Sequence, residues 1–160
     1  MTPAPDAAPA PGDSAVPDAA PVPAGYEFSA DPARMDPAQI HRLLVDHAYW
    51  AAGRSRETQD LLLSTCRSYG IFETASRTQV AYARVLTDGV AFGWLADVVV
   101  APEHRRRGLA RMLVAGLMAD LEPMGIKRMV LKAAEEARPL YESFGWTGID
   151  APEAWMANYG

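Results

Sequence analysis

The sequence predicts an α/β (α+β) fold with the element order strand, two helices, three strands, helix, strand, helix, strand. Residues 69–73 and 79–86 are apolar runs joined by a polar turn, the pattern of an antiparallel hairpin. A third run, 92–100, follows an Asp-Gly turn and ends in β-branched residues, which is typical of a buried strand. From Leu109 onward apolar residues recur every three or four positions, which predicts an amphipathic helix.

The remaining elements follow from similar signals. Residues 26–29 alternate apolar and polar side chains, as a half-buried first strand does. Asp36 before Pro37 is the start signal of a first helix that runs to about Ala48, and Ser55 caps a second helix. After the long helix we expect a strand, a short helix and one or two closing strands, at 126–132, 135–144, 146–149 and 155–159.

The composition indicates one globular domain that follows a different first segment. The chain has 160 residues, of which 49% are hydrophobic, enough for a single buried core. Residues 1–24 are mostly Pro, Ala, Asp and Gly, with too few branched or aromatic side chains to build a core. We therefore expect a disordered Pro/Ala-rich tail over 1–24 and a folded domain over 25–160.

Charge, cysteine content and hydropathy exclude several classes of protein. A formal net charge of −5 argues against nucleic-acid binding. Cys66 is the only cysteine, so neither an intrachain disulfide nor a cysteine-based zinc site can form, and we expect no metal. No apolar stretch is long enough for a membrane span, and the first residues lack the pattern of a signal peptide. The expected location is the cytoplasm.

The junction between the third strand of this run and the long helix is typical of an anion-binding site. The strand stops at Pro102, three arginines follow, and Gly108 stands directly before the helix. Glycine lets a turning backbone approach a ligand, and the N–H groups at a helix N-terminus attract phosphate. The chain has neither G-x-x-x-x-G-K-[ST] nor G-x-G-x-x-G, so the nucleotide loops of ATPases and dinucleotide enzymes are absent.

This junction resembles the coenzyme A diphosphate loop of the GNAT superfamily of N-acetyltransferases. Arg-x-x-Gly-x-Ala at 105–110 matches the family pattern Gln/Arg-x-x-Gly-x-Gly/Ala, and 140–146 is similar to its Leu-Tyr-x-x-x-Gly-aromatic motif. The resemblance covers 26–160 and implies the GNAT fold, a central mixed, mostly antiparallel sheet flanked by helices, with acetyl-CoA as cofactor. It implies cofactor contacts at Val98, Val99, Val100, Arg105, Arg106, Arg107, Gly108, Leu109, Ala110 and Arg111.

The resemblance implies one catalytic residue, and the position of an acidic residue in an apolar stretch suggests another. Tyr141 matches the tyrosine that protonates the departing coenzyme A thiolate, which a phenol can do because it is protonated at neutral pH. Asp97 is the candidate general base, since an apolar environment would raise the pKa of its carboxyl group. A structural ion pair with Arg84 is the alternative and would keep that pKa low. Ala134 stands where many family members carry a cofactor-contacting asparagine, so the resemblance does not extend to that contact.

By the same resemblance, the acceptor pocket involves Tyr49, Trp50, Arg54 and Arg56, in the loop after the first helix and at the start of the second. Two arginines beside two aromatic residues suit an acceptor with a carboxylate or phosphate next to its amine. The alternative is a pair of surface arginines over a packed tryptophan. We therefore predict acetyl transfer to a primary amine of a small, amino-acid-like molecule.

Other functions stay open at this point. The acceptor of an enzyme with these motifs could be a protein N-terminus or a lysine. A non-catalytic acetyl-CoA-binding sensor or scaffold is favoured by Ala134, and an enzyme acting on aminoacyl-tRNA is opposed by the net charge of −5. The sequence also leaves a homodimer open.

Overall fold

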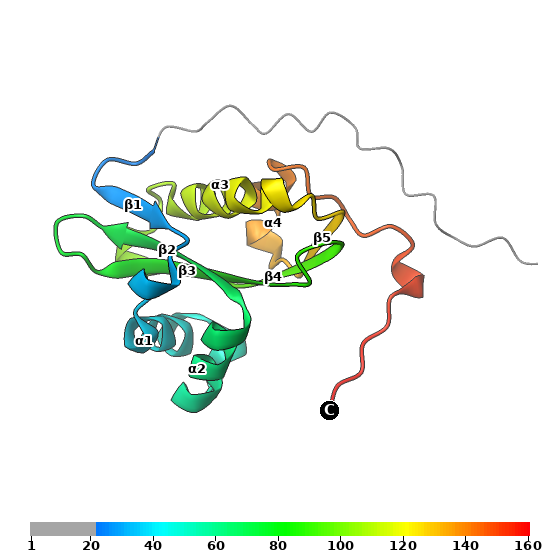
Figure 1. The fold of residues 1–160 in the computed structure, drawn as a ribbon, viewed down its shortest axis with the longest axis horizontal. Coiled ribbons are helices and arrows are strands. Elements are labelled where there is room, and N and C mark those ends of the chain that lie inside the picture. Colours follow the sequence, from blue (N-terminus) through cyan, green and yellow to red (C-terminus); the bar gives the residue numbers. More distant parts are fainter. Residues whose placement is uncertain (1–21) are drawn as a thin grey trace, which may run out of the picture.

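The computed structural model describes residues 22–160, and a five-stranded sheet in the order β1-β2-β3-β4-β5 forms its centre (Figure 1). All neighbouring strands are antiparallel except β4 and β5, which run parallel. The predicted mixed, mostly antiparallel sheet is therefore confirmed. The predicted tail, 1–24, lies almost wholly outside the described residues. The strands are β1 (Tyr26–Ser29), β2 (Arg67–Glu73), β3 (Gln79–Thr87), β4 (Phe92–Val100) and β5 (Arg128–Leu131).

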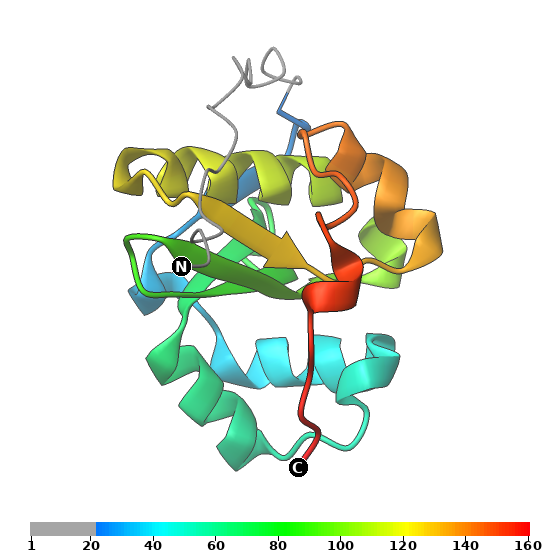
Figure 2. The same cartoon turned by 90° about the vertical axis from the view of Figure 1, so that its right-hand side faces the viewer.

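Helices cover both faces of the sheet. One face carries α1 (Pro37–His47) and α2 (Arg56–Thr65), and the other carries α3 (Leu109–Leu121) and α4 (Arg138–Glu142) (Figures 1 and 2). The predicted helix starts are present, because Asp36 accepts a hydrogen bond from a backbone N–H of α1 at 2.9 Å. Ser55 accepts one from α2 at 3.1 Å. These caps satisfy N–H groups that a helix N-terminus leaves unpaired.

Helix α3 is fixed closely against the sheet. Gly116 faces β1, and a Cβ at this position would lie 2.5 Å from the ring of Phe28, so a larger residue would push the helix away. A short turn, Pro102–His104, is all that separates the end of β4 from the loop before α3. The N-terminus of α3 therefore lies beside the end of β4. The helix buries Leu109, Leu113, Val114, Leu117 and Leu121.

A β-bulge divides β4 into two halves. Tyr82 pairs with Val99 and Arg84 with Ala96, so three steps on β4 oppose two on β3. Asp97 lies in the bulge, with a φ of 55° that non-glycine residues seldom adopt. Strand β5 pairs only with the first half of β4, Phe92 to Leu95. Within residues 22–160, the second half of β4 therefore has no strand on its β5 side.

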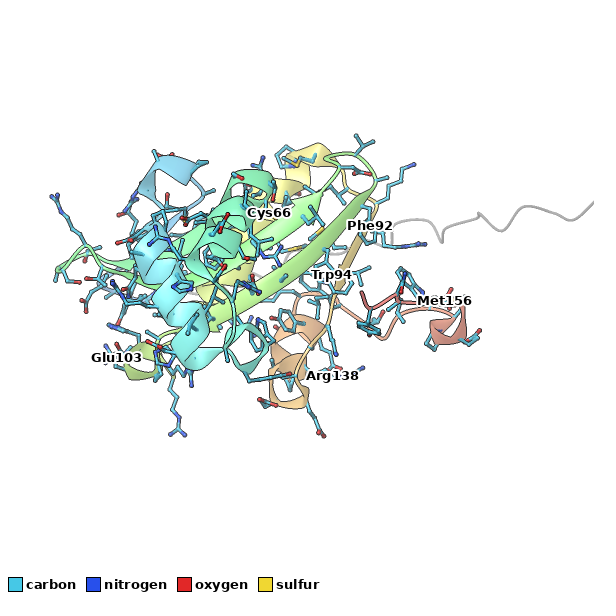
Figure 3. The ribbon with its side chains drawn as sticks, turned by 90° about the horizontal axis from the view of Figure 1, so that it is seen from below. Cys66, Phe92, Trp94, Glu103, Arg138 and Met156 are labelled. Carbon is cyan, nitrogen blue, oxygen red and sulfur yellow. The ribbon has the colours of Figure 1, made fainter. Side chains whose placement is uncertain are left out.

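The closing strands predicted at 146–149 and 155–159 are wrong. The described chain after α4 contains one short turn, Pro152–Ala154, and no strand. Ala151, with a φ of 47°, precedes this turn, and a proline has no N–H for a sheet ladder. Met156 is 95% exposed and lies away from the sheet in Figure 3. The alternation of apolar residues in this segment therefore does not correspond to pairing with β5.

Candidate functional site

The second half of β4 presents free backbone groups at its open edge. The N–H of Ala101 donates to Val80 on β3 at 2.8 Å. Because backbone polar groups alternate between the two edges of a strand, those of Val98 and Val100 face away from β3. The side chain of Val99 is buried in the core. The N–H groups of Val98 and Val100 and the carbonyl oxygen of Val98 can therefore bond an extended ligand beside β4, whereas the carbonyl oxygen of Val100 accepts a hydrogen bond from Arg105.

The loop before α3 has the geometry of an anion site. Gly108 adopts a φ of 77° directly before the helix, a conformation that disfavours any side chain. A Cβ here would meet only Pro23, at 3.8 Å, so space is available in front of the backbone. The N–H groups of residues 106–111 make no hydrogen bond with any part of the described chain. Together with the positive end of the helix dipole, they form a cluster of donors suited to a diphosphate.

The three consecutive arginines have different partners. Arg105 donates from Nε to the carbonyl oxygen of Val100 at 3.0 Å. Arg107 donates from Nη1 to the hydroxyl of Tyr26 at 3.0 Å. Arg106, with a φ of 60°, has no side-chain hydrogen bond or ion pair within residues 22–160. Of the three, Arg106 is therefore the arginine whose whole guanidinium group has no partner in the described chain.

Tyr141 lies on α4 with its hydroxyl group unengaged. The residue is 7% exposed, and burial raises the pKa of its hydroxyl above the ordinary value. Its ring packs edge-to-face on Trp146, with the centroids 5.8 Å apart. Its hydroxyl makes no hydrogen bond within the described residues. Arg111 of α3 donates to the hydroxyl of Ser143, the residue directly after α4, at 2.9 Å. This hydrogen bond links α3 to the end of α4.

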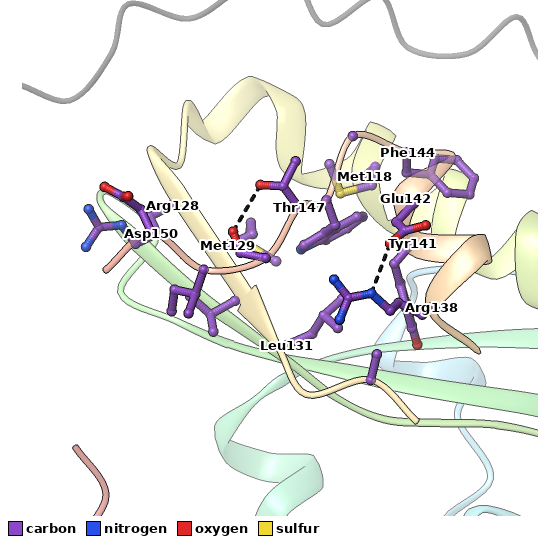
Figure 4. A pocket seen from close by; sticks show the side chains of 16 residues that line it. Met118, Arg128, Met129, Leu131, Arg138, Tyr141, Glu142, Phe144, Thr147 and Asp150 are labelled. Carbon is purple, nitrogen blue, oxygen red and sulfur yellow. Dashed lines mark hydrogen bonds and ion pairs between the residues drawn. The ribbon is translucent and has the colours of Figure 1, made fainter. Parts of the chain in front are cut away.

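A cavity of about 580 Å³ lies between α3, β5, α4 and the segment that follows α4 (Figure 4). Tyr141, Trp146, Met118 and Leu131 are among the residues that line it, and Arg138 pairs with Glu142 at its rim at 2.9 Å. Its volume falls in the range typical of small-ligand pockets. Tyr141 thus borders a cavity that is large enough for part of a ligand.

Asp97 does not have the environment predicted for a general base. Arg54 Nη1 and Arg84 Nε each lie 2.6 Å from its Oδ2, and Trp50 Nε1 donates to Oδ1 at 3.0 Å. Burial raises the pKa of Asp97, but the hydrogen bonds from the two arginines outweigh burial and hold this pKa below its ordinary value. The predicted upward shift is therefore wrong, because the carboxylate is paired. A carboxylate held ionised by two guanidinium groups is a poor proton acceptor.

The four predicted acceptor residues do not all converge. Tyr49 and Trp50 lie in the short turn Tyr49–Ala51, with rings edge-to-face at 5.1 Å and exposures of 82% and 48%. Arg54 points inward to Asp97, as described above. Arg56 instead pairs with Asp60 on the exposed side of α2, at 2.7 Å. The structure thus brings Trp50 and Arg54 together and separates Arg56 from them.

Sequence reasoning missed three residues that contact the site. Gln59 accepts a hydrogen bond from Arg54 at 2.9 Å. The Tyr26 hydroxyl, which holds Arg107, also contacts Nδ1 of His104 at 2.8 Å. The contacts of Tyr26 join segments that are distant in the sequence. Gln59 lies in a polar stretch that matches no motif. The apolar–polar alternation of β1 marked Tyr26 as a core residue, and no signal marked its hydroxyl group.

The residues present fit coenzyme A, a long ligand with a diphosphate. The free N–H groups before α3 suit the diphosphate, and the open edge of β4 suits an extended arm. Ala134 offers no polar side chain for a further contact. Within the described chain, no group of His, Cys, Asp and Glu side chains could hold a metal ion. None of its helices is long and apolar enough to cross a bilayer.

Several known proteins are similar to this chain. The family model described as Acetyltransferase (GNAT) family matches residues 40–146. A crystal structure from Xanthomonas campestris, described as a GNAT-family acetyltransferase, has a TM-score of 0.77 and 32% identity over 84% of this chain and 93% of that one. A Gibberella zeae protein described as an acetyltransferase is 28% identical over 135 residues, 72% of this chain and 75% of its own. A glucosamine 6-phosphate N-acetyltransferase of Trypanosoma brucei is 34% identical over 58 residues, 36% of this chain and 40% of its own.

The part of the chain that matches the family model contains the features of the site described above. It includes both halves of β4, the anion loop and Tyr141. The Xanthomonas structure shares the fold over nearly its whole length. This chain accordingly belongs to the GNAT family of acetyltransferases and is an acyltransferase.

Proposed function

We propose that this enzyme is an N-acetyltransferase that moves the acetyl group of acetyl-CoA to the primary amine of a small, amino-acid-like molecule. One observation carries the proposal, namely the arrangement of three features around one end of β4. The open edge of β4 offers backbone groups, the loop before α3 offers unpaired N–H groups, and α4 offers the unengaged hydroxyl of Tyr141. These match the needs of acyl transfer: an anchor, a site for developing charge and a proton donor.

The anchor is assigned to the loop before α3 and to Arg106. The unpaired N–H groups of residues 106–111 lie at the N-terminus of α3, and the Arg106 side chain adds a positive charge that no described residue neutralises. Bound acetyl-CoA would supply the thioester, whose carbonyl carbon the amine attacks and whose thiolate leaves. The N–H groups of Val98 and Val100 face the open edge, where one of them can donate to the carbonyl oxygen of the acetyl group as negative charge develops on it.

Proton handling is divided between Tyr141 and water. As a C–N bond formed and the C–S bond of the bound thioester broke, the Tyr141 hydroxyl would give its proton to the departing sulfur, and the phenolate would then take a proton back from water. A phenol is protonated at neutral pH, and burial, which raises the pKa of this hydroxyl, keeps it protonated to a higher pH. The proton of the attacking amine is assigned to water, because Asp97 is held ionised by Arg54 and Arg84.

A small acceptor is supported by the loop after α1 and by the names of relatives. Trp50 and Arg54 offer an aromatic face and a partly buried guanidinium group in the same place. The similar proteins from Trypanosoma brucei and Arabidopsis thaliana are named for acetylation of glucosamine 6-phosphate, a small phosphorylated amine. The Arabidopsis structure is 19% identical to this chain and shares its fold.

The proposal is tested by calorimetric titration with acetyl-CoA and free coenzyme A, followed by an acetyl-transfer screen on the same sample. The screen should include amino acids, glucosamine 6-phosphate, polyamines, and peptides with a free N-terminus or lysine. Binding with turnover of a small amine is the expected result. Binding with no turnover would favour the sensor or scaffold function that Ala134 suggests, and turnover of peptides alone would make the acceptor a protein. Absence of binding would overturn the assignment of the anchor.

A further inference from the structure

Asp97 is the buried centre of a group of polar side chains from four parts of the fold. We name Trp50, Arg54, Gln59, Arg84 and Asp97 the Asp97 cluster. Oδ1 of Asp97 accepts from Trp50 Nε1 at 3.0 Å and from Arg54 Nη2 at 3.1 Å. Oδ2 accepts from Arg54 Nη1 and from Arg84 Nε, each at 2.6 Å. A carboxylate has about four acceptor positions, so this one has none left for a further donor.

The charges of the cluster do not balance. Two guanidinium groups face one carboxylate, which leaves one positive charge in excess. The side chains of Arg54 and Arg84 are only 14% and 15% exposed, and that of Asp97 is 2% exposed. Neither arginine has another acidic partner within residues 22–160. A charge removed from water to this extent is costly unless an opposite charge accompanies it.

The hydrogen bonds do not balance either. Nε of Arg54 and Nη2 of Arg84 have no acceptor in the described chain, and Nη1 of Arg84 finds only the sulfur of Cys66, at 3.4 Å. Gln59 is fully buried, and its Nε2 has no partner there, although its Oε1 accepts from Arg54 at 2.9 Å. Among these unpaired donors in the described chain, Gln59 Nε2 is the one buried from solvent, and an unpaired buried donor lowers stability. The cluster therefore has surplus donors, surplus positive charge and no free acceptor of its own.

We infer that the Asp97 cluster is the binding site for an anionic oxygen group, a carboxylate or a phosphate, that the acceptor carries close to its amine. The inference rests on the proposed function and names the chemical class of its acceptor. An anion at the cluster supplies both the missing charge and the missing acceptors. Guanidinium groups suit this task, because their planar fork binds the two oxygens of such a group together.

The position of the cluster limits the distance between anion and amine. Asp97 directly precedes Val98, whose N–H faces the open edge of β4 where transfer is proposed. An acceptor that reaches both places needs only a short spacer, as in an α- or β-amino acid or a phosphorylated amino alcohol. The half-exposed ring of Trp50, held by Asp97, lies on the solvent side of the cluster. Long polyamines and peptide lysines lack an anion at this spacing.

The test compares small amines that differ only in their anionic group. Glycine is matched with glycinamide, and O-phosphoethanolamine with ethanolamine. The full-length ¹⁵N-labelled protein is titrated while the indole N–H signal of Trp50 and the Nε–H signals of Arg54 and Arg84 are followed by NMR. We expect saturable shifts with at least one anionic probe, and at least tenfold weaker binding of its neutral match. The anion that binds identifies a carboxylate or a phosphate.

Two variants separate the cluster from general charge effects. Arg84→Gln leaves Arg54 and Asp97 as a balanced pair, so the protein should fold and lose the anion-dependent shifts. Arg42→Gln, which removes an exposed charge from α1, should keep them. The inference is overturned if no anionic probe shifts these signals, if neutral probes bind equally well, or if Arg84→Gln retains the response. The comparison of probes on the unmodified protein decides the question if Arg84→Gln does not fold.

Failure of this inference is distinguishable from failure of the proposed function. Anion-specific shifts in a protein that does not bind acetyl-CoA would overturn the function and leave the anion site standing. Transfer to glycinamide and ethanolamine as fast as to glycine and O-phosphoethanolamine would support the function and overturn the anion site.

Discussion

Nε of Arg105 donates a hydrogen bond to the carbonyl oxygen of Val100 at 3.0 Å, which holds the first arginine of the anion loop against the end of β4. Arg107 is held in the same way by Tyr26. The loop therefore keeps a fixed start beside the open edge of β4, and the intervening Arg106 has its side chain free of partners in the described chain. The distance from the edge to the loop is thus set by side chains that do not themselves need to touch a ligand.

The backbone at Gly108 should be essential for coenzyme A binding. Gly108→Glu is expected to raise the Kd for coenzyme A by about 100-fold, roughly 2.8 kcal/mol, because it places an anion and a strained φ against the diphosphate site. Calorimetric titration measures this change. Gly89→Glu is the matched control, because Gly89 has a similar φ of 74° in a distant turn, with no atom within 4 Å of an added Cβ. Equal loss in both variants would attribute the effect to backbone strain alone.

The three arginines should contribute unequally to affinity. Arg106→Gln is expected to weaken coenzyme A binding about tenfold, roughly 1.4 kcal/mol, and to reduce the dependence of Kd on salt. Arg107→Gln should change affinity less, since its guanidinium group already contacts Tyr26, and should lower the melting temperature instead. Titration at two salt concentrations, with a thermal melt of each variant, checks both statements. A larger affinity loss for Arg107→Gln would contradict the assignment.

Removal of the Tyr141 hydroxyl should affect turnover rather than binding. Tyr141→Phe is expected to lower kcat by about 100-fold, within the range for general acid catalysis, and to leave the Kd for acetyl-CoA nearly unchanged. Tyr159→Phe is the control, because Tyr159 is 89% exposed near the end of the chain. Steady-state kinetics and calorimetry measure the two quantities. An unchanged kcat would remove the acid role from Tyr141.

The pH profile of the enzyme should reflect the same hydroxyl group. Burial raises the pKa of Tyr141, so the protonated form that donates persists to a higher pH than in a free phenol. The loss of kcat assigned to this group is therefore expected above pH 10, and it should be missing from the residual activity of Tyr141→Phe. A Tyr141-dependent loss of kcat near pH 8 would show that the environment of the hydroxyl differs from the one described here.

Asp97 should matter strongly for stability. Asp97→Asn leaves two poorly exposed guanidinium groups without a counter-charge and is expected to cost about 3–5 kcal/mol. Asp60→Asn, which removes an exposed partner of Arg56, should cost under about 1 kcal/mol. Urea denaturation of both variants gives these values. A cost for Asp97→Asn as small as that for Asp60→Asn would mean that solvent neutralises the cluster.

The stabilising effect of Asp97 should also depend on pH. Its pKa is lower in the folded protein than the value of about 3.9 in an unfolded chain, so folding favours the ionised form. Its contribution is fully present above about pH 4 and is lost as the pH falls through the folded pKa. The difference in free energy of unfolding between the native protein and Asp97→Asn should therefore shrink in acid. A constant difference between pH 7 and pH 3 would contradict the downward shift.

Local patterns in the sequence were sufficient for most of the elements. The start of α1 at Pro37, the hairpin of β2 and β3, and the amphipathic α3 all depend on neighbours in the chain, and all were predicted. The same is true of the loop at 105–110, because its glycine, its charge and the following helix are adjacent. The closing strands were predicted wrongly, because an alternating pattern records which residues are apolar and not whether a partner strand is available.

What only the tertiary structure decided is which side chains meet. Asp97 reads as a lone acid in an apolar strand, and whether its pKa rises or falls depends on where the folded chain places Arg54 and Arg84, 43 and 13 residues away. The bulge that places Asp97 there is a matter of register between β3 and β4, which no local pattern encodes. The sequence by itself determined the family, the elements and the anion loop, because these rest on adjacent residues. The folded chain decided the charge state and the partners of the acceptor side, because electrostatic energies depend on distances in space.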